Sequence, residues 1–460
     1  MVPKNHGFGG GAAETMLDPL VAVWMLIAIL LILTLPRKQA IVPFLLACFT
    51  IPIAQVVLVG PLHFPVLRIL ILAGLVRTAG QGGLTSNRRF PGGFNRLDKV
   101  VVLWTVVSLI ANFLQWMDPQ ALIKLIGDFI DTLGGYLVVR FLIPDRETVR
   151  RTIEVLALIS MIQGVCMMSE QVTHRNVFGA WGGNAPTIRN GHVRSEGVMG
   201  TLYAGTFAGV IIPLFLWLRT EKKSKKAAIM GLIGATAMVT ASHASTAWLA
   251  YGSGLLGLCF WPLRKRMKFV RYGIVATLLV LHLSMNGPVW SLIEKIDLTG
   301  GSSSFHRYML VDNCIRHFDQ WWLIGFRYPS TWGFDMWDLC NQFVAVALGG
   351  GLAGLCVYIA IYSRGFAAIG NARKLVSGDH RYEWFLWTFG STLFANVVAS
   401  FGINYLLPLL LLFFPLLACI SVASSEAKQK VAREASPSVD SLFPSAMPSV
   451  GKYLPLGETS

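Results

Sequence analysis

Charged residues are scarce in this 460-residue chain: Asp, Glu, Lys and Arg make up 14% of it, and hydrophobic residues 54%. Soluble globular domains carry about 25% charged residues, so this shortage and a mean hydropathy of +0.57 exclude a soluble globular domain. Many apolar runs have the length that crosses roughly 30 Å of hydrocarbon as a helix, and lipid does not tolerate open sheet edges. The sequence therefore predicts an all-α fold, a polytopic transmembrane helical bundle of about 12–13 spans with a large outer loop.

The seven cysteines include no Cys-x-x-Cys pair and no Cys/His spacing typical of a metal site. Cys314 and Cys340 share one long loop, where a disulfide would form if that loop faces an oxidising compartment. The sequence also lacks a convincing nucleophile triad. His243 stands among serines and threonines at 240–246, and a structural histidine is the simpler interpretation of it.

Residues 1–16 are rich in glycine and lack the basic segment of a cleaved signal peptide. We interpret 1–16 as an outer N-terminal segment, 17–421 as the transmembrane domain, and the Pro/Ser-rich 422–460 as a disordered cytoplasmic tail. The expected spans are 17–35, 41–60, 64–77, 99–116, 120–140, 152–171, 201–218, 227–242, 246–263, 272–289, 341–363, 383–401 and 403–421.

Basic residues are distributed unequally between the two sides of these spans. Of the 39 Lys and Arg, 29 fall on the side that includes the C-terminal tail and eight on the other. Cytoplasmic loops are the basic ones, so we expect the N-terminus outside and the C-terminus in the cytoplasm. Most of the eight exceptions lie in two outer loops, 172–200 and 288–340. An anionic ligand at the outer face would explain them.

The first outer loop places Arg189 and Arg194 in a glycine-rich segment just before a helix enters the membrane. A helix N-terminus beside guanidinium groups suits a phosphate, because backbone dipoles and forked donors both favour an oxyanion. The alternative is a solvated loop whose arginines meet lipid headgroups.

The second outer loop has apolar residues at about helical spacing over 303–325, which predicts an amphipathic helix at the membrane interface. Placed there, Arg307 and Arg316 would reach a lipid diphosphate. A purely structural interfacial helix is the alternative.

Of the ionisable residues inside the expected spans, Arg68, Asp128 and Asp131 are the hardest to dismiss. A charge at the bilayer centre costs about 2.5–3.5 kcal/mol on insertion scales, so such residues usually face the bundle interior with a partner. Arg68 is near the outer end of its span and would approach a site there from below. A structural pair between Arg68 and one Asp is an equally good interpretation.

Two stretches resemble the O-antigen ligase and polymerase superfamily. Arg194-Ser-Glu-Gly197, followed by 204–207 and an apolar run with Pro213, is similar to its mid-chain motif. The loop from His306-Arg307 to Asn341-Gln342-Phe343 and the glycines at 349–351 resembles its large periplasmic loop. The resemblance covers roughly 20–420.

This resemblance implies a metal-independent glycosyltransferase with no cofactor, in the bacterial inner membrane. Such proteins act in cell-surface polysaccharide or exopolysaccharide biosynthesis, as ligases or polymerases. They move glycan from an undecaprenyl diphosphate donor to an acceptor hydroxyl at the outer face of the membrane. The implied partners are that lipid-linked glycan, membrane lipid and other polysaccharide export proteins, with no nucleic acid.

The resemblance also assigns residues. Arg194 and Arg307 match positions that contact the diphosphate, and Asn341 matches the Asn of a His-Asn pair. Arg189, Arg316 and Arg68 are further substrate-binding candidates.

The histidine of that His-Asn pair, the family's proposed base, is replaced here by Cys340. We therefore expect Asp338, His306 or His317 to take the acid–base role, or the protein to be a divergent or inactive member.

Two other classes stay open. A transporter or flippase of envelope polysaccharide is disfavoured, because the sequence shows no hydropathy repeat and no paired interrupted helices. A non-catalytic scaffold of the same machinery would be free to lose the arginines without consequence.

Overall fold

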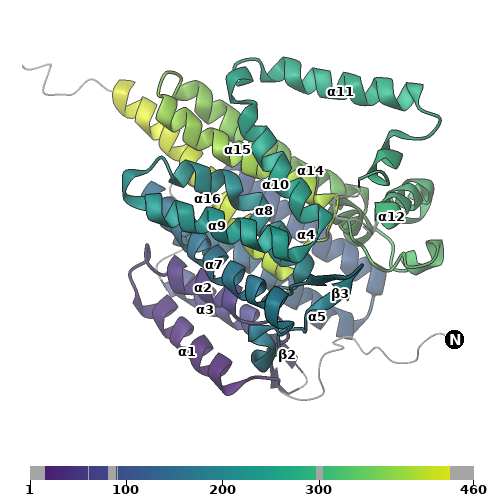
Figure 1. The fold of residues 1–460 in the computed structure, drawn as a ribbon, viewed down its shortest axis with the longest axis horizontal. Helices are drawn as coiled ribbons and strands as arrows, with labels where there is room; N and C mark the ends of the chain where they lie inside the picture. The colour runs from purple at the N-terminus through teal and green to yellow at the C-terminus, as the bar shows by residue number, and fades with distance from the viewer. Residues whose placement is uncertain (1–15, 61, 81–89, 91, 297–303, 436–460) are drawn as a thin grey trace, which may run out of the picture.

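The computed structural model describes residues 16–60, 62–80, 90, 92–296 and 304–435. These residues form helices packed side by side, with two short hairpins (Figure 1). The elements up to the middle of the chain are α1 (Pro19–Thr34), α2 (Ile41–Thr50), β1 (Val56–Val59), β2 (Leu62–Pro65), α3 (Val66–Gly80), α4 (Arg96–Trp116), α5 (Pro119–Phe129), the π-helical turn η1 (Ile130–Gly134), α6 (Gly135–Leu142), α7 (Arg146–Thr173), η2 (Val177–Trp181), β3 (Thr187–Arg189) and β4 (His192–Arg194).

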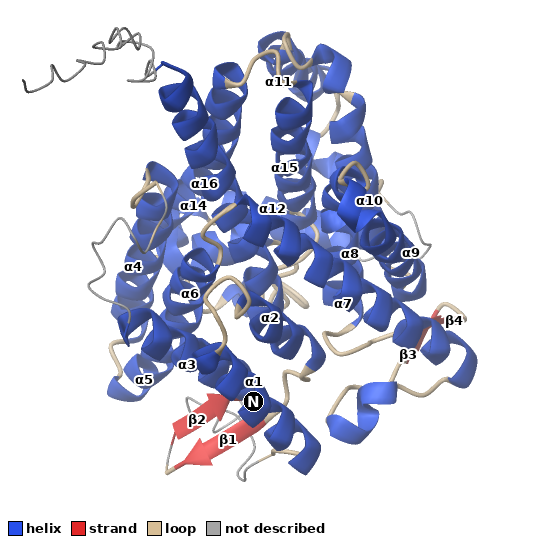
Figure 2. Ribbon diagram, turned by 90° about the vertical axis from the view of Figure 1, so that its left-hand side faces the viewer, coloured by secondary structure: helices blue, strands red, loops and turns tan. Residues whose placement is uncertain are grey.

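The remaining elements are α8 (Thr201–Leu218), η3 (Lys222–Ser224), α9 (Lys225–Ser242), α10 (Ser245–Cys259), η4 (Trp261–Leu263), α11 (Met267–Ser284), η5 (Val289–Ile293), α12 (Ser304–Arg316), α13 (Phe318–Trp321), η6 (Pro329–Trp332), α14 (Gln342–Leu375), α15 (His380–Ser400) and α16 (Leu407–Ala435). Both hairpins lie toward the end of the bundle opposite to the one where α16 leaves it (Figure 2).

Each of the expected spans coincides at least in part with a helix. Among the described residues, six helices are long and apolar enough to cross a membrane: α4, α7, α8, α11, α14 and α16. Two further apolar helices, α1 and α2, are shorter. The helical, membrane-spanning class is therefore supported, while the count of 12–13 spans stays a prediction.

The expected span at 41–60 is wrong in its second half. Helix α2 ends at Thr50, and Ile51 is already extended (φ −97°, ψ 125°) because Pro52 disfavours a helical residue before it. The valine-rich segment after it forms strand β1, paired with β2 in an antiparallel hairpin. β-Branched residues pack well on such a pleated ribbon.

The predicted disordered tail also begins too early. Helix α16 continues to Ala435, so the first part of 422–460 is helical. The rest of that segment, like the N-terminal segment up to residue 15, lies outside the described residues.

The α14 helix is interrupted at Gly351, where the backbone is not helical (φ 63°, ψ −168°). The segment before α14 fills the break: Phe326 N donates to Leu348 O (2.9 Å), and Leu352 N donates to Trp322 O (2.8 Å). A Cβ at Gly351 would collide with the carbonyl of Leu323, so the tight fit requires glycine as well as the positive φ. The break thus fastens the segment before α14 to the middle of that helix.

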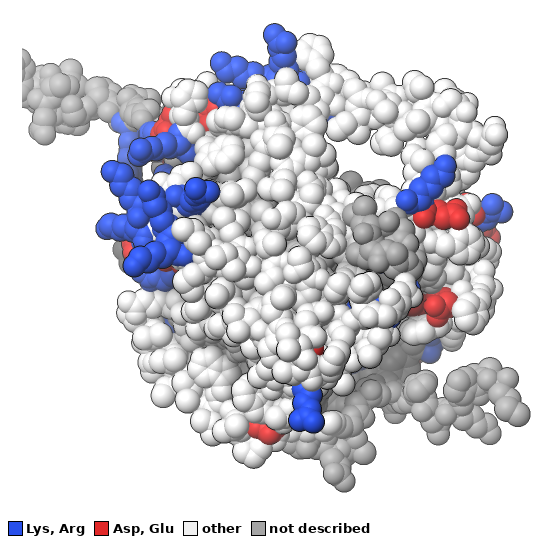
Figure 3. All heavy atoms as spheres, in the orientation of Figure 1, with Lys and Arg blue, Asp and Glu red and all other residues white. Residues whose placement is uncertain are grey.

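The α11 helix stands apart from the rest. None of its residues is buried, and Figures 1 and 3 show an open gap between it and the body of the protein. Figure 3 also shows Lys and Arg gathered over the end of the bundle where α16 leaves it. This is the unequal charge distribution that the sequence predicts between the two sides.

Candidate functional site: a cluster of arginines from two loops

The β3–β4 hairpin presents Arg189, His192 and Arg194 on one face. Its register pairs Thr187 with Arg194 and Arg189 with His192 across an Asn190–Gly191 turn. Directly paired residues of antiparallel strands lie on the same face, and so do residues two apart along a strand. The hairpin therefore concentrates two guanidinium groups and an imidazole.

Buried hydrogen bonds hold this hairpin and the turn after it against the bundle. Glu170 of α7, which is fully buried, accepts from the backbone N–H groups of Glu196 (2.8 Å) and Gly197 (3.0 Å). Gln171 Nε2 donates to Val193 O at 2.8 Å, and Ser195 N donates to Ala241 O at 3.1 Å. The position of Arg194 is thus determined by α7 and α9.

Arg194 lies beside the turn between α9 and α10, its Nε 3.4 Å from Ser242 O. In the same turn His243 stacks on His192, with ring centroids 4.9 Å apart and an interplanar angle of 13°. Burial lowers the pKa of His243, and His192 and Arg194 lower it further. Both histidine rings therefore belong to the surroundings of Arg194.

The second loop contributes Arg307, which helix α12 places in the interior with only 8% of the residue exposed. Its Nε donates to Gly402 O (3.2 Å), which also accepts from Thr246 Oγ1 (3.2 Å). Cys340 is buried next to it, and burial raises the pKa of that thiol to about 11.

The two loops meet at these arginines. Burial lowers the pKa of Arg194, and the charges of Arg189 and Arg307 lower it further, whereas Glu196 raises it. Burial also lowers the pKa of Arg307. The charge of Arg189 lowers it further, whereas Cys340 and Asp338 raise it. We call Arg189, Arg194 and Arg307 the arginine cluster.

No ion pair neutralises this cluster: among the residues that the structure describes, none of its three guanidinium groups lies within 4.0 Å of a carboxylate. Asp338 and Glu196 act on it only over a longer range. Arg307 is buried and Arg194 half-buried, whereas Arg189 is exposed. Like charges near one another repel and usually have a partner, so the arrangement fits an anion that bridges them.

Two of the acid–base candidates lie at the cluster. His306 precedes Arg307 on α12, and its Nε2 is 3.0 Å from the backbone oxygen of Asp338. The Asp338 side chain is exposed, and its charge reaches both Arg307 and Cys340. A substrate hydroxyl near Arg307 would thus have a carboxylate and an imidazole close by.

The third candidate, His317, follows the far end of α12. Ten residues of helix separate it from Arg307, about 15 Å at 1.5 Å per residue. Its Nδ1 is 2.9 Å from Asn313 O, and its ring stacks on Trp332 at 5.0 Å. These contacts place it in an aromatic group and not at the arginine cluster.

The other candidates have structural partners. Arg68 makes a bidentate pair with Asp131 (Nε–Oδ1 2.9 Å, Nη2–Oδ2 2.7 Å). Arg316 pairs with Asp312 at 2.6 Å and leaves 70% of its side chain exposed. Asn341, 1% exposed, caps α14 by accepting from the N–H groups of Phe343 (2.9 Å) and Val344 (3.2 Å).

Sequence reasoning missed Tyr203, on the first turn of α8. Its hydroxyl donates to Asn404 Oδ1 (3.3 Å), and Asp338 lies within electrostatic range of it. It also missed the carbonyl of Gly402, because a backbone acceptor distant in the sequence leaves no pattern. Cys314 and Cys340 pack in one small hydrophobic group with both thiols free.

Among the described residues, no group of three or more His, Cys, Asp and Glu side chains is arranged to hold a metal ion. No protein-family model matches the chain, and no curated protein matches it.

Proposed function

We propose that this protein is a membrane glycosyltransferase of the O-antigen ligase or polymerase type. In this proposal it transfers or polymerises glycan from an undecaprenyl diphosphate donor at the outer face of the bacterial inner membrane. The observation that carries the proposal is the arginine cluster, in which Arg194 and Arg307 come together from loops far apart in the sequence and make no ion pair with any described residue. The N-terminus would then lie outside and the C-terminus in the cytoplasm.

The chemistry requires little beyond this cluster. The acceptor oxygen attacks the anomeric carbon of the donor sugar, the bond from that carbon to the diphosphate oxygen breaks, and the lipid diphosphate leaves. The arginines stabilise the negative charge that develops on the departing oxygens. Such preorganised charge is commonly the largest contribution to catalysis, and losing one donor costs about 10²–10³-fold in rate.

The proton of the acceptor hydroxyl goes to a base, which contributes about 10²–10⁴-fold. Cys340 is unsuitable, because burial raises its pKa to about 11 and keeps the thiol protonated at neutral pH. We assign the role to Asp338 first and to His306 second, since both lie beside Arg307.

The outward side of α12 fits a lipid-linked donor. Phe305 and Ile315 of α12 are 58% and 47% exposed, as is 44% of Phe318 just after it, whereas Arg307 on the same helix is buried. In this proposal the apolar side chains lie at the membrane interface, where a lipid diphosphate is found at the same depth as Arg307.

The interrupted helix α14 favours a transporter as a second candidate, because broken helices build the midplane sites of transporters. However, the carbonyls freed by this break already accept hydrogen bonds. Asn112 Nδ2 donates to Gly349 O (2.7 Å), and Gln115 Nε2 donates to Leu348 O (3.1 Å). An ion or substrate would have to displace them, so the glycosyltransferase is the better supported function.

The test is product formation by the purified protein in nanodiscs, with an undecaprenyl diphosphate-linked oligosaccharide as donor. We compare Asp338→Asn, His306→Ala, His317→Ala and Cys340→Ser with the native chain. We expect Asp338→Asn to lose about 10²-fold or more in rate, and Cys340→Ser and His317→Ala to keep it.

Loss of transfer in Cys340→Ser alone would contradict the assignment of Asp338. The native protein could instead be inactive on every donor, while Arg194→Ala and Arg307→Ala support polysaccharide export in cells as well as the native chain does. That result would establish a non-catalytic scaffold. Cysteine-accessibility labelling checks the orientation: 189–200 and 304–338 should react from outside, and labelling of 304–338 from the cytoplasm would exclude the mechanism.

A further inference from the structure

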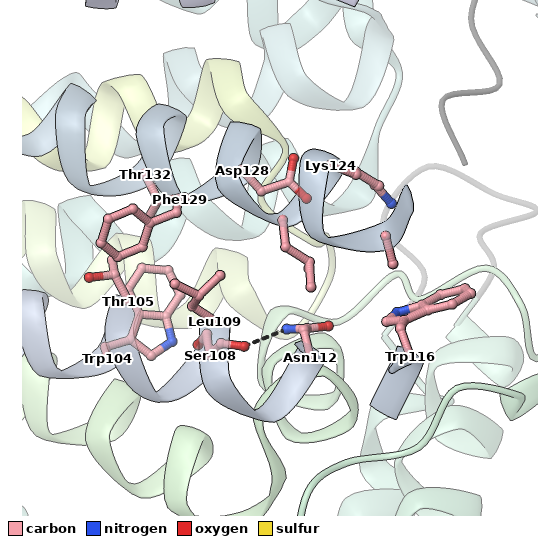
Figure 4. A pocket seen from close by; sticks show the side chains of 12 residues that line it. Trp104, Thr105, Ser108, Leu109, Asn112, Trp116, Lys124, Asp128, Phe129 and Thr132 are labelled. Carbon is pink, nitrogen blue, oxygen red and sulfur yellow. Dashed lines mark hydrogen bonds between the residues drawn. The ribbon is translucent and has the colours of Figure 1, made fainter. Parts of the chain in front are cut away.

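A polar cavity of about 140 Å³ lies between α4 and α5, on elements other than those that carry the arginine cluster. Figure 4 shows its walls, with one set of side chains from α4 and the other from α5 and η1. The polar and aromatic residues that matter for its chemistry are Trp104, Ser108, Asn112, Trp116, Lys124 and Asp128.

One wall of this cavity contains a buried donor without an acceptor. Trp104 is 7% exposed, and its indole N–H has no hydrogen-bond partner among the described residues. Buried N–H groups without partners are rare in folded proteins, and each one calls for an explanation such as a bound water, an ion or a functional role. An oxygen atom of a bound molecule would satisfy this one.

The cavity borders the break in α14. Asn112, in its wall, donates to Gly349 O at 2.7 Å, and Ser108 packs against Gly350. Asn112 thus satisfies a carbonyl that the break frees, and this hydrogen bond fixes its side chain in the wall of the cavity.

Two of the residues that line the cavity are charged, and they have opposite signs. Lys124 and Asp128 are one helical turn apart on α5, and both are exposed. Beyond them Arg68 pairs with Asp131 (2.7 Å) and lies 3.9 Å from Asp128. Arg327 stacks on Trp116, its Cζ 3.1 Å from the ring centroid, and is not one of the lining residues. A lining with one cation and one anion favours a ligand that carries both signs.

The same helix presents exposed apolar side chains. Leu122, Ile123 and Ile126 of α5 are exposed by 37%, 54% and 47%, directly beside Lys124. The cavity is close in size to the roughly 150 Å³ engineered cavity that holds benzene, so it has room for a small group such as a headgroup but not for an oligosaccharide.

We propose that this cavity binds the headgroup of a zwitterionic phospholipid of the phosphoethanolamine class. Lys124 contacts the phosphate, Asp128 accepts from the primary ammonium, and the Trp104 N–H donates to a headgroup or glycerol oxygen. The acyl chains lie along the exposed apolar side chains of α5. This inference does not rest on the proposed glycosyl transfer.

Native mass spectrometry tests it, with the protein released from nanodiscs of equal phosphatidylethanolamine and phosphatidylglycerol. We expect one retained phosphatidylethanolamine, with affinity reduced by about threefold to tenfold in Lys124→Gln and in Asp128→Asn. Trp104→Phe keeps the ring, removes the N–H and should weaken binding about threefold. Lys99→Gln, at the other end of α4, is the matched control and should bind as the native chain does.

Both charge variants alter exposed side chains, so their folding is preserved and circular dichroism verifies it. Preference for phosphatidylglycerol, or phosphatidylethanolamine binding equal in Lys124→Gln, Asp128→Asn and Lys99→Gln, would overturn the proposal. Because the readout is lipid retention and not glycan transfer, this result is independent of the enzymatic one.

Discussion

The protein contains two kinds of buried arginine, and they differ in what surrounds them. Arg140 is completely buried, yet its Nε contacts Asp98 at 3.2 Å, and the same carboxylate accepts from the Tyr136 hydroxyl. Arg307 is also buried, but its Nε contacts only a backbone carbonyl and its charged neighbours include another arginine. Arg140 thus has a carboxylate partner within the chain, whereas no carboxylate among the described residues lies within 4.0 Å of the Arg307 guanidinium. In the proposed function an anionic substrate takes that place.

We expect the largest loss of stability when one partner of a buried ion pair is removed. We expect Arg140→Met to destabilise the folded state by about 3–5 kcal/mol, because it leaves the Asp98 carboxylate buried without its cation. Unfolding by denaturant in detergent micelles measures it. Arg150→Met, in the more exposed pair with Glu154 (3.5 Å), is the control and should cost no more than about 1 kcal/mol.

Substitutions in the arginine cluster should reduce glycan transfer and leave stability unchanged. We expect Arg194→Ala and Arg307→Ala each to reduce glycan transfer by about 10²–10³-fold. Stability should be retained, because each substitution removes a like-charge repulsion. Arg307→Lys should recover little, since a point charge does not reproduce bidentate contact with phosphate oxygens.

Transfer assays and unfolding on the same preparations separate these two effects. Full activity of both alanine variants would remove the donor site, and a large loss of stability would make Arg307 a structural arginine like Arg140.

Arg68 tests the distinction between structural and substrate-binding arginines, because the sequence allowed both roles for it. Its bidentate pair with Asp131 predicts that Asp131→Asn costs about 1–3 kcal/mol, and that adding Arg68→Met costs less than the two single changes combined. A double-mutant cycle of unfolding free energies measures the coupling. If the double variant folds well but transfers no glycan, Arg68 binds substrate after all.

Arg316 should give the smallest effect. Arg316 and Asp312 are one helical turn apart, and the Arg316 side chain is 70% exposed. Arg316→Ala should therefore change stability by no more than about 0.5 kcal/mol. Glycan transfer should be unchanged. A tenfold loss of transfer would extend the donor site along α12 and would contradict the exclusion of Arg316 from the arginine cluster.

These contrasts show which features were readable in the sequence. The length of an apolar run is a local property, so the expected spans coincide at least in part with helices. The excess of arginine in the loops 172–200 and 288–340 predicted Arg194 and Arg307 as binding candidates, and the structure brings these two near each other. The pairing of Arg68 with Asp131 and the Gly402 acceptor for Arg307 join segments distant along the chain, and no local pattern specifies them.

The same reason explains the errors in the fold. The prediction for 41–60 followed hydrophobicity and gave too little weight to Pro52 and the β-branched residues after it. The break at Gly351 depends on a loop that docks into it, which a glycine run alone does not reveal.

The isolation of α11 has a consequence for the bilayer around the protein. An 18-residue helix is about 27 Å long, slightly less than the roughly 30 Å of an average hydrocarbon core. Helices held in a bundle keep their tilt through their neighbours, but α11 has no buried residue to hold it. Its inclination is therefore governed by membrane thickness, and reconstitution in lipids of increasing acyl length should reorient α11 while the rest of the bundle keeps its geometry.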